Sequence, residues 1–217
     1  MATNAHFVFS TPPAEVSFEA FSNWYEGHVA DILAGPGFPA ARRYKVDGVV
    51  SDRPPTMYPH LSLYHVDGDG TEALAELDRR VKSGAVPLPD WFGDIRFASF
   101  AGTALEDDDA QLPDHAYLVF SKPPAGMGFE DFSRWYAVHM RENLTADGFD
   151  AAWRFGLQPA TVDPDAPCEA AHGAWYEVHR ELPELRAALA EARDAGRVHF
   201  PEWFGDIEFA SVDCVAL

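Results

Sequence analysis

Apolar side chains recur every three or four residues across residues 18–32, which is the spacing of one face of a helix. The positions on this face are Phe18, Phe21, Tyr25, His28 or Val29, and Ile32. Ser17 directly precedes them and predicts an N-cap, because its hydroxyl can accept a hydrogen bond from a backbone N–H of the first turn. Gly35-Pro36-Gly37 predicts the end of this helix.

Four short segments around this helix have the apolar or alternating patterns that are typical of strands. They are residues 5–10, 38–46, 60–66 and 95–105. A second helix is predicted between the last two, from a cap at Thr71 to Gly84, with its apolar face inward. That face consists of Leu74, Leu77 and Val81. The order is therefore β-α-β-β-α-β, which places both helices on one face of a four-stranded antiparallel sheet.

The whole pattern occurs twice in the chain. Phe21–Leu33 returns as Phe132–Leu144, and Trp91–Ser99 returns as Trp203–Ser211 with eight of nine residues identical. The offset is 111 residues at first and 112 from His60 onward. This period is the size of a small domain and not of a solenoid repeat.

The duplication predicts the architecture. We divide the chain into a first α+β repeat (residues 1–105), an acidic linker (residues 106–114) and a second α+β repeat (residues 115–217). Each sheet has one apolar face without helices, and the second copy is its natural cover. The fold class is therefore α+β, with two tandem ferredoxin-like β-α-β-β-α-β repeats that form a pseudo-dimeric α+β barrel inside one chain and carry four helices outside.

Composition narrows the classes of partner. The chain of 217 residues has a formal net charge of −19 and few lysines, so it repels phosphate backbones and anionic membranes. We expect no nucleic-acid or membrane partner and, since no leader or long apolar run is visible, a cytoplasmic protein. Cys168 and Cys214 are expected to be free thiols. The nine histidines lack metal-ligand spacing, so neither a metal nor a cofactor is expected.

The repeated helix carries the candidate chemistry. His28 lies three residues after Tyr25, and His139 lies three residues after Tyr136, so each pair shares a helix face that is expected to turn toward the sheet. A neutral imidazole in such a place can serve as a general acid or base. The alternative is a core histidine satisfied by one hydrogen bond. Recurrence does not decide between the two, because a duplicated structural residue recurs as well.

The two copies differ on this face. Ile32 of the first copy is Asn143 in the second, four residues after His139, so the second pocket is predicted to be the more polar one. If only one pocket functions, we favour the second. The alternative role for Asn143 is to cap a buried backbone group.

Two further groups of residues are candidates for binding a substrate. The third strand of each copy presents a His/Tyr pair, His60 with Tyr64 and His172 with Tyr176, which would bind a carbonyl or phenol or else pack as aromatic core. The helix tryptophans, Trp24 and Trp135, either line a pocket or fill the core. The repeated Trp-Phe-Gly-Asp segments are interpreted as structural turns.

The segments Trp24-Tyr25-x-x-His28 and Pro36-Gly37-Phe38, with the following Ala41-Arg42-Arg43-Tyr44, resemble the EthD-like branch of the dimeric α+β barrel superfamily. The resemblance covers nearly the whole chain. It implies a pocket between sheet and helices, proton transfer by a His or Tyr, and a role for the second-strand arginine, here Arg43 and Arg154, in steadying an enolate or carboxylate. The second copy has Asp147-Gly148 in place of the family's Pro-Gly.

The superfamily includes cofactor-independent monooxygenases, polyketide cyclases, lactone isomerases, haem-associated enzymes and proteins without assigned activity. The resemblance therefore implies a cofactor-independent enzyme that uses His/Tyr acid-base chemistry on a small apolar or aromatic carbonyl-type substrate. Cyclase, isomerase, lyase and monooxygenase reactions remain open. A non-catalytic binding or accessory protein is the first alternative, and a haem-associated protein is the second. The partner would be a small molecule, and a homodimer beyond the intrachain pseudo-dimer is left open.

Overall fold

The computed structural model describes residues 4–50, 58–68, 70–161 and 171–217, and Cys168 lies outside these ranges. The first repeat follows the predicted order of strands and helices. Its elements are β1 (Asn4–Thr11), α1 (Phe18–Leu33), β2 (Ala41–Val50), β3 (His60–Val66), α2 (Thr71–Lys82), the 3-10 turn η1 (Phe92–Asp94) and β4 (Arg96–Ala104).

The second repeat has the same order. Its elements are β5 (His115–Lys122), α3 (Phe129–Asn143), β6 (Phe149–Thr161), β7 (His172–Val178), α4 (Leu182–Asp194), the 3-10 turn η2 (Glu202–Asp206) and β8 (Glu208–Ala216). Among the described residues, no helix is long and apolar enough to cross a membrane.

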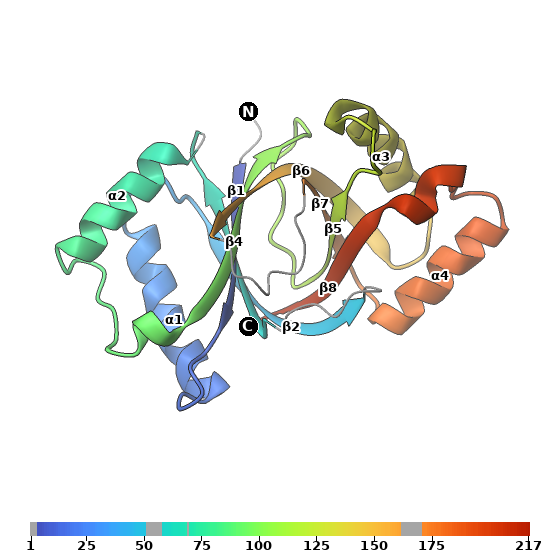
Figure 1. The fold of residues 1–217 in the computed structure, drawn as a ribbon. Coiled ribbons are helices and arrows are strands. Elements are labelled where there is room, and N and C mark those ends of the chain that lie inside the picture. Colours follow the sequence, from blue (N-terminus) through green and yellow to red (C-terminus); the bar gives the residue numbers. More distant parts are fainter. Residues whose placement is uncertain (1–3, 51–57, 69, 162–170) are drawn as a thin grey trace.

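The eight strands form one closed antiparallel barrel. Within each repeat the strands pair in the ferredoxin-like order, β4-β1-β3-β2 and β8-β5-β7-β6. The repeats join at both edges, where β4 pairs with β6 and β2 pairs with β8. Closure removes the free edges that would otherwise attract other strands. The predicted pseudo-dimeric α+β barrel is confirmed, with α1 and α2 outside one half and α3 and α4 outside the other (Figure 1).

Strand alternation divides the core into an inner and an outer part, because successive side chains of a strand point to opposite faces. Phe7 and Phe9 of β1 and Phe120 of β5 belong to the aromatic cluster that fills the barrel interior. The intervening side chains, such as Val8 of β1 and Val119 of β5, pack beneath the helices in two separate outer clusters. Each outer cluster is the place where a helix can form a ligand site against its own sheet.

The start of α1 agrees with the prediction, whereas the start of α2 does not. Ser17 caps α1, since its hydroxyl accepts a hydrogen bond from the Ala20 N–H at 3.2 Å. The cap of α2 is Gly70, in the left-handed conformation at φ +80°, and Thr71 is the first helical residue.

The predicted inward face of α2 is also wrong at Leu74, which is 38% exposed, because Ala73 is the buried residue instead. The reason is a close approach: a Cβ on Gly37 would lie 2.4 Å from the Ala73 Cβ. Only a small side chain on α2 fits against this turn, and that contact sets the rotation of the helix.

The segment predicted as an acidic linker packs against the barrel. Ala110 is 4% exposed and belongs to the interior cluster, and Leu112 packs against that cluster. The indole N–H of Trp175 donates a hydrogen bond to the Gln111 carbonyl at 3.1 Å, and Arg42 donates one to the Leu112 carbonyl at 2.6 Å. The connection between the repeats is thus part of the core, while the side chains of Asp107, Asp108, Asp109 and Asp114 are exposed.

Candidate ligand site in the second repeat

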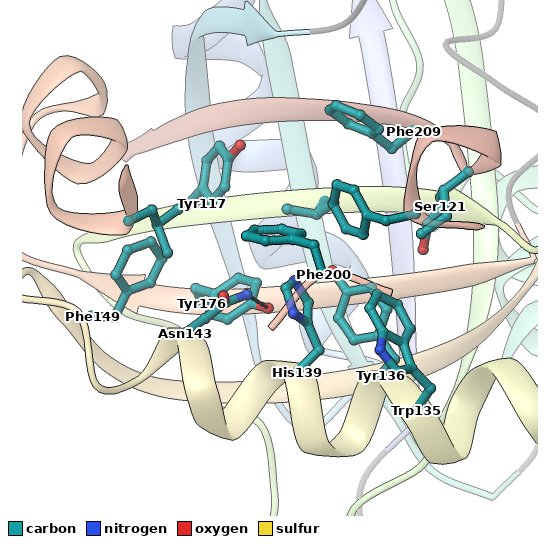
Figure 2. A pocket seen from close by; sticks show the side chains of 14 residues that line it. Tyr117, Ser121, Trp135, Tyr136, His139, Asn143, Phe149, Tyr176, Phe200 and Phe209 are labelled. Atoms are coloured by element: carbon teal, nitrogen blue, oxygen red, sulfur yellow. Dashed lines mark hydrogen bonds between the residues drawn. The ribbon is translucent and has the colours of Figure 1, made fainter. Parts of the chain in front are cut away.

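An apolar cavity of about 190 Å³ lies between α3 and the outer face of the second repeat's sheet, with α4 and η2 completing its wall (Figure 2). Its lining consists mostly of aromatic and aliphatic side chains with a few polar tips. The lining residues are Tyr117, Val119, Ser121, Trp135, Tyr136, His139, Asn143, Phe149, Tyr176, Leu189, Phe200, Phe204, Ile207 and Phe209. Such a composition suits a small apolar ligand that is oriented by a few hydrogen bonds.

His139 points from α3 into this cavity and is 6% exposed (Figure 2). Its ring stacks on Trp135, with centroids 4.8 Å apart and planes 15° apart, and Phe200 covers it at 5.5 Å. Burial lowers the pKa of His139 to about 4, and the Glu142 carboxylate opposes this decrease. The imidazole is therefore neutral near pH 7, which is the form that can accept a proton.

A polar wall stands beside His139. The Asn143 amide, one helical turn further along α3, donates a hydrogen bond to the Tyr176 hydroxyl at 3.2 Å. Burial raises the pKa of Tyr176 to about 12, against the hydrogen bonds from Asn143 and Tyr136. On the neighbouring strands, the Tyr117 hydroxyl donates a hydrogen bond to the Ser211 hydroxyl at 2.8 Å. The Tyr117 and Tyr136 hydroxyls donate to Ser211 and Tyr176, so the Tyr176 O–H and the second N–H of the Asn143 amide can donate to a ligand oxygen.

Gly148 helps to shape the same wall. It has a φ of +103°, a conformation that side chains rarely adopt, and a Cβ there would meet the Leu185 side chain at 2.7 Å. The tight turn at Gly148 begins β6 directly, so that Phe149 is buried against the Tyr176 ring at 5.4 Å. The first copy repeats this arrangement, with Gly37 at a φ of +90° and the Phe38 ring 5.7 Å from the Tyr64 ring.

The first repeat has the same aromatic frame. His28 stacks on Trp24 with centroids 4.8 Å apart and planes 21° apart, almost as in the second repeat. Burial lowers the pKa of His28 too, although the side chain is only half-buried. When the lining is matched through the repeat, eleven of its fourteen residues are identical. The three that differ are Tyr117, Asn143 and Phe200, which correspond to His6, Ile32 and Leu88.

The third-strand histidines are core residues. His60 and His172 are fully buried, and each shares a hydrogen bond through Nδ1 with a serine hydroxyl of the neighbouring strand, Ser10 at 2.9 Å and Ser121 at 3.3 Å. Burial lowers the pKa of both to about 3. His172 lies behind the Tyr136 ring, with centroids 4.3 Å apart, and it is not among the cavity-lining residues.

The second-strand arginines connect sheet and helix. Arg43 donates to the Ser22 carbonyl of α1, and Arg154 donates to the Ser133 carbonyl of α3, both at 2.5 Å. Arg154 also pairs with Glu106 at 2.5 Å. Arg154 does not line the cavity, so its position indicates a structural bridge and not a contact with a ligand there.

The structure thus brings together five of the residues predicted for the second site: Trp135, Tyr136, His139, Asn143 and Tyr176. The prediction missed the rest of the lining. Tyr117 and Ser121 could have been found from the period-two alternation of β5, which places them on the face opposite Leu118 and Phe120. Phe204 lies in the repeated Trp-Phe-Gly-Asp segment, which was interpreted as structural only. No sequence signal marks Phe200. Within the described ranges, no cluster of three or more His, Cys, Asp or Glu side chains could hold a metal ion.

No protein-family model matches this chain, and no curated protein matches it. Solved structures do resemble it. An anthrone oxidase-like protein superposes with a TM-score of 0.53 at 15% identity, over 98% of this chain and 91% of that chain. A chlorite dismutase mutant from Candidatus Nitrospira defluvii, in complex with cyanide, superposes with a TM-score of 0.53 at 9% identity, over 99% of this chain and 90% of that chain.

The chain has the dimeric α+β barrel fold. At these identities the likeness establishes the fold alone, and dimeric α+β barrels support many chemistries.

Proposed function

We propose that the second repeat binds a small, neutral, ring-bearing carbonyl compound and that His139 acts on it as a general base without a redox cofactor. The observation that carries this proposal is the position of His139, a neutral imidazole in an apolar cavity with the Asn143–Tyr176 hydrogen-bond pair one helical turn away. The EthD-like resemblance supports the same chemistry.

The chemical step needs only residues of this site. The imidazole of His139 takes the proton from a carbon next to the ligand carbonyl, and the electron pair of that C–H bond moves onto the carbonyl oxygen as an enolate. Tyr176 accepts hydrogen bonds from Asn143 and Tyr136, so its own O–H can donate to this oxygen. Preorganised donors of this kind stabilise the charge that develops on the ligand oxygen in an apolar cavity. The imidazolium proton then exchanges with solvent, and transfer of the new proton or deuteron to the carbon completes the exchange and restores neutral His139.

The size and charge of the cavity limit the ligand. About 190 Å³ is below the range of roughly 300–1,000 Å³ that is usual for drug-sized ligands. The cavity lining contains no Lys, Arg, Asp or Glu, so a neutral ligand is favoured over a carboxylate or an amine. One structure of the same fold is described as anthrone oxidase-like, and that name points to a fused-ring ketone.

A haem does not fit this cavity. His139 would be the candidate axial ligand, yet its ring is stacked on Trp135 and covered by Phe200 and Phe204. The remaining space is too small for a porphyrin, and no basic side chain lines it to pair with propionates. We therefore assign no step to haem.

The test is proton exchange into a probe ketone. β-Tetralone, an aromatic ketone with acidic C–H groups, is incubated in D₂O with the protein, and loss of its α-protons is followed by proton NMR. We expect accelerated exchange with the natural protein and with His28→Gln, and at least a hundredfold loss with His139→Gln, the lower end of a general base's usual contribution. The rate should be flat above about pH 5 and fall below it, as His139 gains its proton.

The outcomes of this assay distinguish catalysis by His139 from non-catalytic binding. Binding of β-tetralone, seen as quenching of tryptophan fluorescence, without accelerated exchange would favour the non-catalytic binding protein. Equal losses in His28→Gln and His139→Gln would contradict a single site in the second repeat. If neither substitution changes binding or exchange, the histidines are core residues and the proposal fails.

A further inference from the structure

The carboxylate of Glu142 lies between two histidines at the edge of the cavity. Glu142 is on α3, one turn after His139, and its Oε2 lies 4.0 Å from the His139 Nδ1. On its other side, its Oε1 lies 2.7 Å from the Nδ1 of His199, which precedes η2. None of the catalytic roles described above uses Glu142 or His199.

The buried nitrogen of His139 faces this carboxylate. Nδ1 is inaccessible to solvent and has no hydrogen-bond partner within the described part of the chain. A buried polar atom without a partner is costly, and a carboxylate at 4.0 Å is the nearest charged group that could hold a proton there. At 4.0 Å the carboxylate acts on the Nδ1 proton through its charge.

His199 anchors Glu142 on the solvent side. Its backbone N–H donates to Oε2 at 3.0 Å, and its ring, which is 73% exposed, contacts Oε1 at 2.7 Å. These two contacts lower the pKa of Glu142, against the burial that raises it, so the carboxylate is charged near pH 7. The same contacts fix the residue next to Phe200, which covers His139.

The first repeat lacks this arrangement at the matching positions. Glu142 corresponds to Asp31, whose side chain is one methylene shorter, and His199 corresponds to Pro87, which has neither an imidazole nor a backbone N–H. A charged group next to the stacked histidine is thus present in both copies, while the anchor for it is specific to the second.

We propose that Glu142, anchored by His199, is a positioning residue that keeps the proton of neutral His139 on Nδ1 and leaves the Nε2 lone pair for the ligand. The carboxylate also stabilises the imidazolium that forms when Nε2 accepts a proton. This proposal rests on the proposed function of His139, but the arrangement it predicts exists without any ligand.

The other titratable groups near His139 do not offer an acceptor of this kind. They are Tyr136 on its own helix, Tyr176 on β7 and Tyr117 on β5, and burial raises the pKa of all three, so they stay neutral. Glu142 is therefore the charged group that can select the tautomer of His139.

The test is the tautomer of His139, read from the two imidazole ¹⁵N chemical shifts of the uniformly labelled full chain at pH 7. We expect the natural protein to carry the proton on Nδ1. Glu142→Gln should shift the population toward the Nε2-protonated form by about tenfold, the effect of a nearby charge on a proton equilibrium. His199→Ala should cause a smaller shift in the same direction, because it frees the carboxylate but keeps the backbone N–H.

Asp31→Asn in the first repeat is the matched control, and it should leave the His139 signals unchanged. An Nε2-protonated His139 in the natural protein, or unchanged shifts in Glu142→Gln, would overturn the proposal. Because no substrate is added, this result is independent of the proton-exchange assay. A correct tautomer without β-tetralone exchange would contradict the proposed catalysis and leave the positioning role standing.

Discussion

The two repeats share an aromatic frame and differ in the polar groups placed on it. Both stack a histidine on a tryptophan at 4.8 Å and back it with a Tyr–His core pair at 4.3 Å. The donor at Asn143 and the anchored carboxylate of Glu142 have no equivalent at Ile32 and Asp31. The shared residues therefore explain the architecture, and we expect the function to depend on the residues that differ.

The prediction with the largest expected effect is that the two repeats unfold together as one cooperative unit. Phe21 and Phe132 are fully buried equivalents under their helices, and truncation of such a residue costs about 3–5 kcal/mol. Because the barrel is closed by strand pairs between the repeats, Phe21→Ala and Phe132→Ala should each destabilise the whole chain by a similar amount. Urea unfolding followed by tryptophan fluorescence and by far-ultraviolet circular dichroism measures this.

In that experiment both probes should report a single coincident transition, with an unchanged dependence on urea. Two separate transitions in Phe132→Ala, with the first repeat unfolding later, would mean that each half has its own stability. The edge pairings β4–β6 and β2–β8 would then contribute little.

The second prediction concerns acid. His60 and His172 are buried and neutral, with pKa values of about 3 against about 6.5 when unfolded. Below about pH 6.5 these two histidines bind protons in the unfolded chain but stay neutral in the folded chain. The free energy of unfolding therefore decreases as the pH falls, by about 1.4 kcal/mol per pH unit for each histidine. His60→Asn and His172→Asn should each reduce this slope equally, as measured by urea unfolding between about pH 6 and pH 4.

An unequal reduction would show that the two core histidines are not equivalent. A control at pH 8, where neither histidine titrates, separates the slope from any constant cost of the substitution. The carboxylates that titrate below about pH 5 add to the slope, but they are common to both variants and cancel in the comparison.

The third prediction exchanges the residue that distinguishes the two helices. Ile32→Asn places an amide among apolar side chains of the first repeat and should cost about 1–3 kcal/mol. Asn143→Ile removes the donor to Tyr176, a loss of about 1 kcal/mol that the added apolar burial partly offsets. β-Tetralone binding should weaken about tenfold in Asn143→Ile and stay unchanged in Ile32→Asn. A reversed ranking would place the ligand in the first repeat.

Much of the fold could be predicted from the sequence because its signals are local and duplicated. Period-two and period-3.6 patterns identify the elements, and the apolar second face of each sheet requires a cover. The edge pairings of β4 with β6 and of β2 with β8 have no local signal, since they join residues far apart in the chain. The rotation of α2 depended on the contact between Gly37 and Ala73, which no pattern within the helix reveals.

The site was predictable only on its helical side. Residues spaced three or four apart on α3 must share a face, so Tyr136, His139 and Asn143 could be grouped directly. The role of Arg154 could not be predicted, because the sequence does not show which group its long side chain reaches. In the structure it reaches the Ser133 carbonyl of α3 and not the cavity. Phe200 and His199 come from an irregular segment, and the place of such a segment is set by tertiary contacts such as the His199–Glu142 pair.

The smallest effect lies at the start of the two equivalent helices. Ser17 caps α1, whereas Gly128 occupies the cap of α3 without a side-chain hydrogen bond. The backbone is extended at both, with φ and ψ of −64° and 152° at Ser17 and −70° and 153° at Gly128, and a Cβ on Gly128 would meet nothing within 4 Å. A serine therefore fits there without strain.

Gly128→Ser should raise the free energy of unfolding by about 0.5–1 kcal/mol, from the new cap and from the smaller entropy of the unfolded chain. Ser17→Gly should lower it by a similar amount, and thermal unfolding would show opposite shifts of about 1–4 °C. If Gly128→Ser does not change the stability, Glu130 and Asp131 in the first turn of α3 already stabilise its free N–H groups. The first turn of α1 has one acidic residue, Glu19. The first-turn N–H groups would then be stabilised by a hydroxyl in the first repeat and by carboxylates in the second.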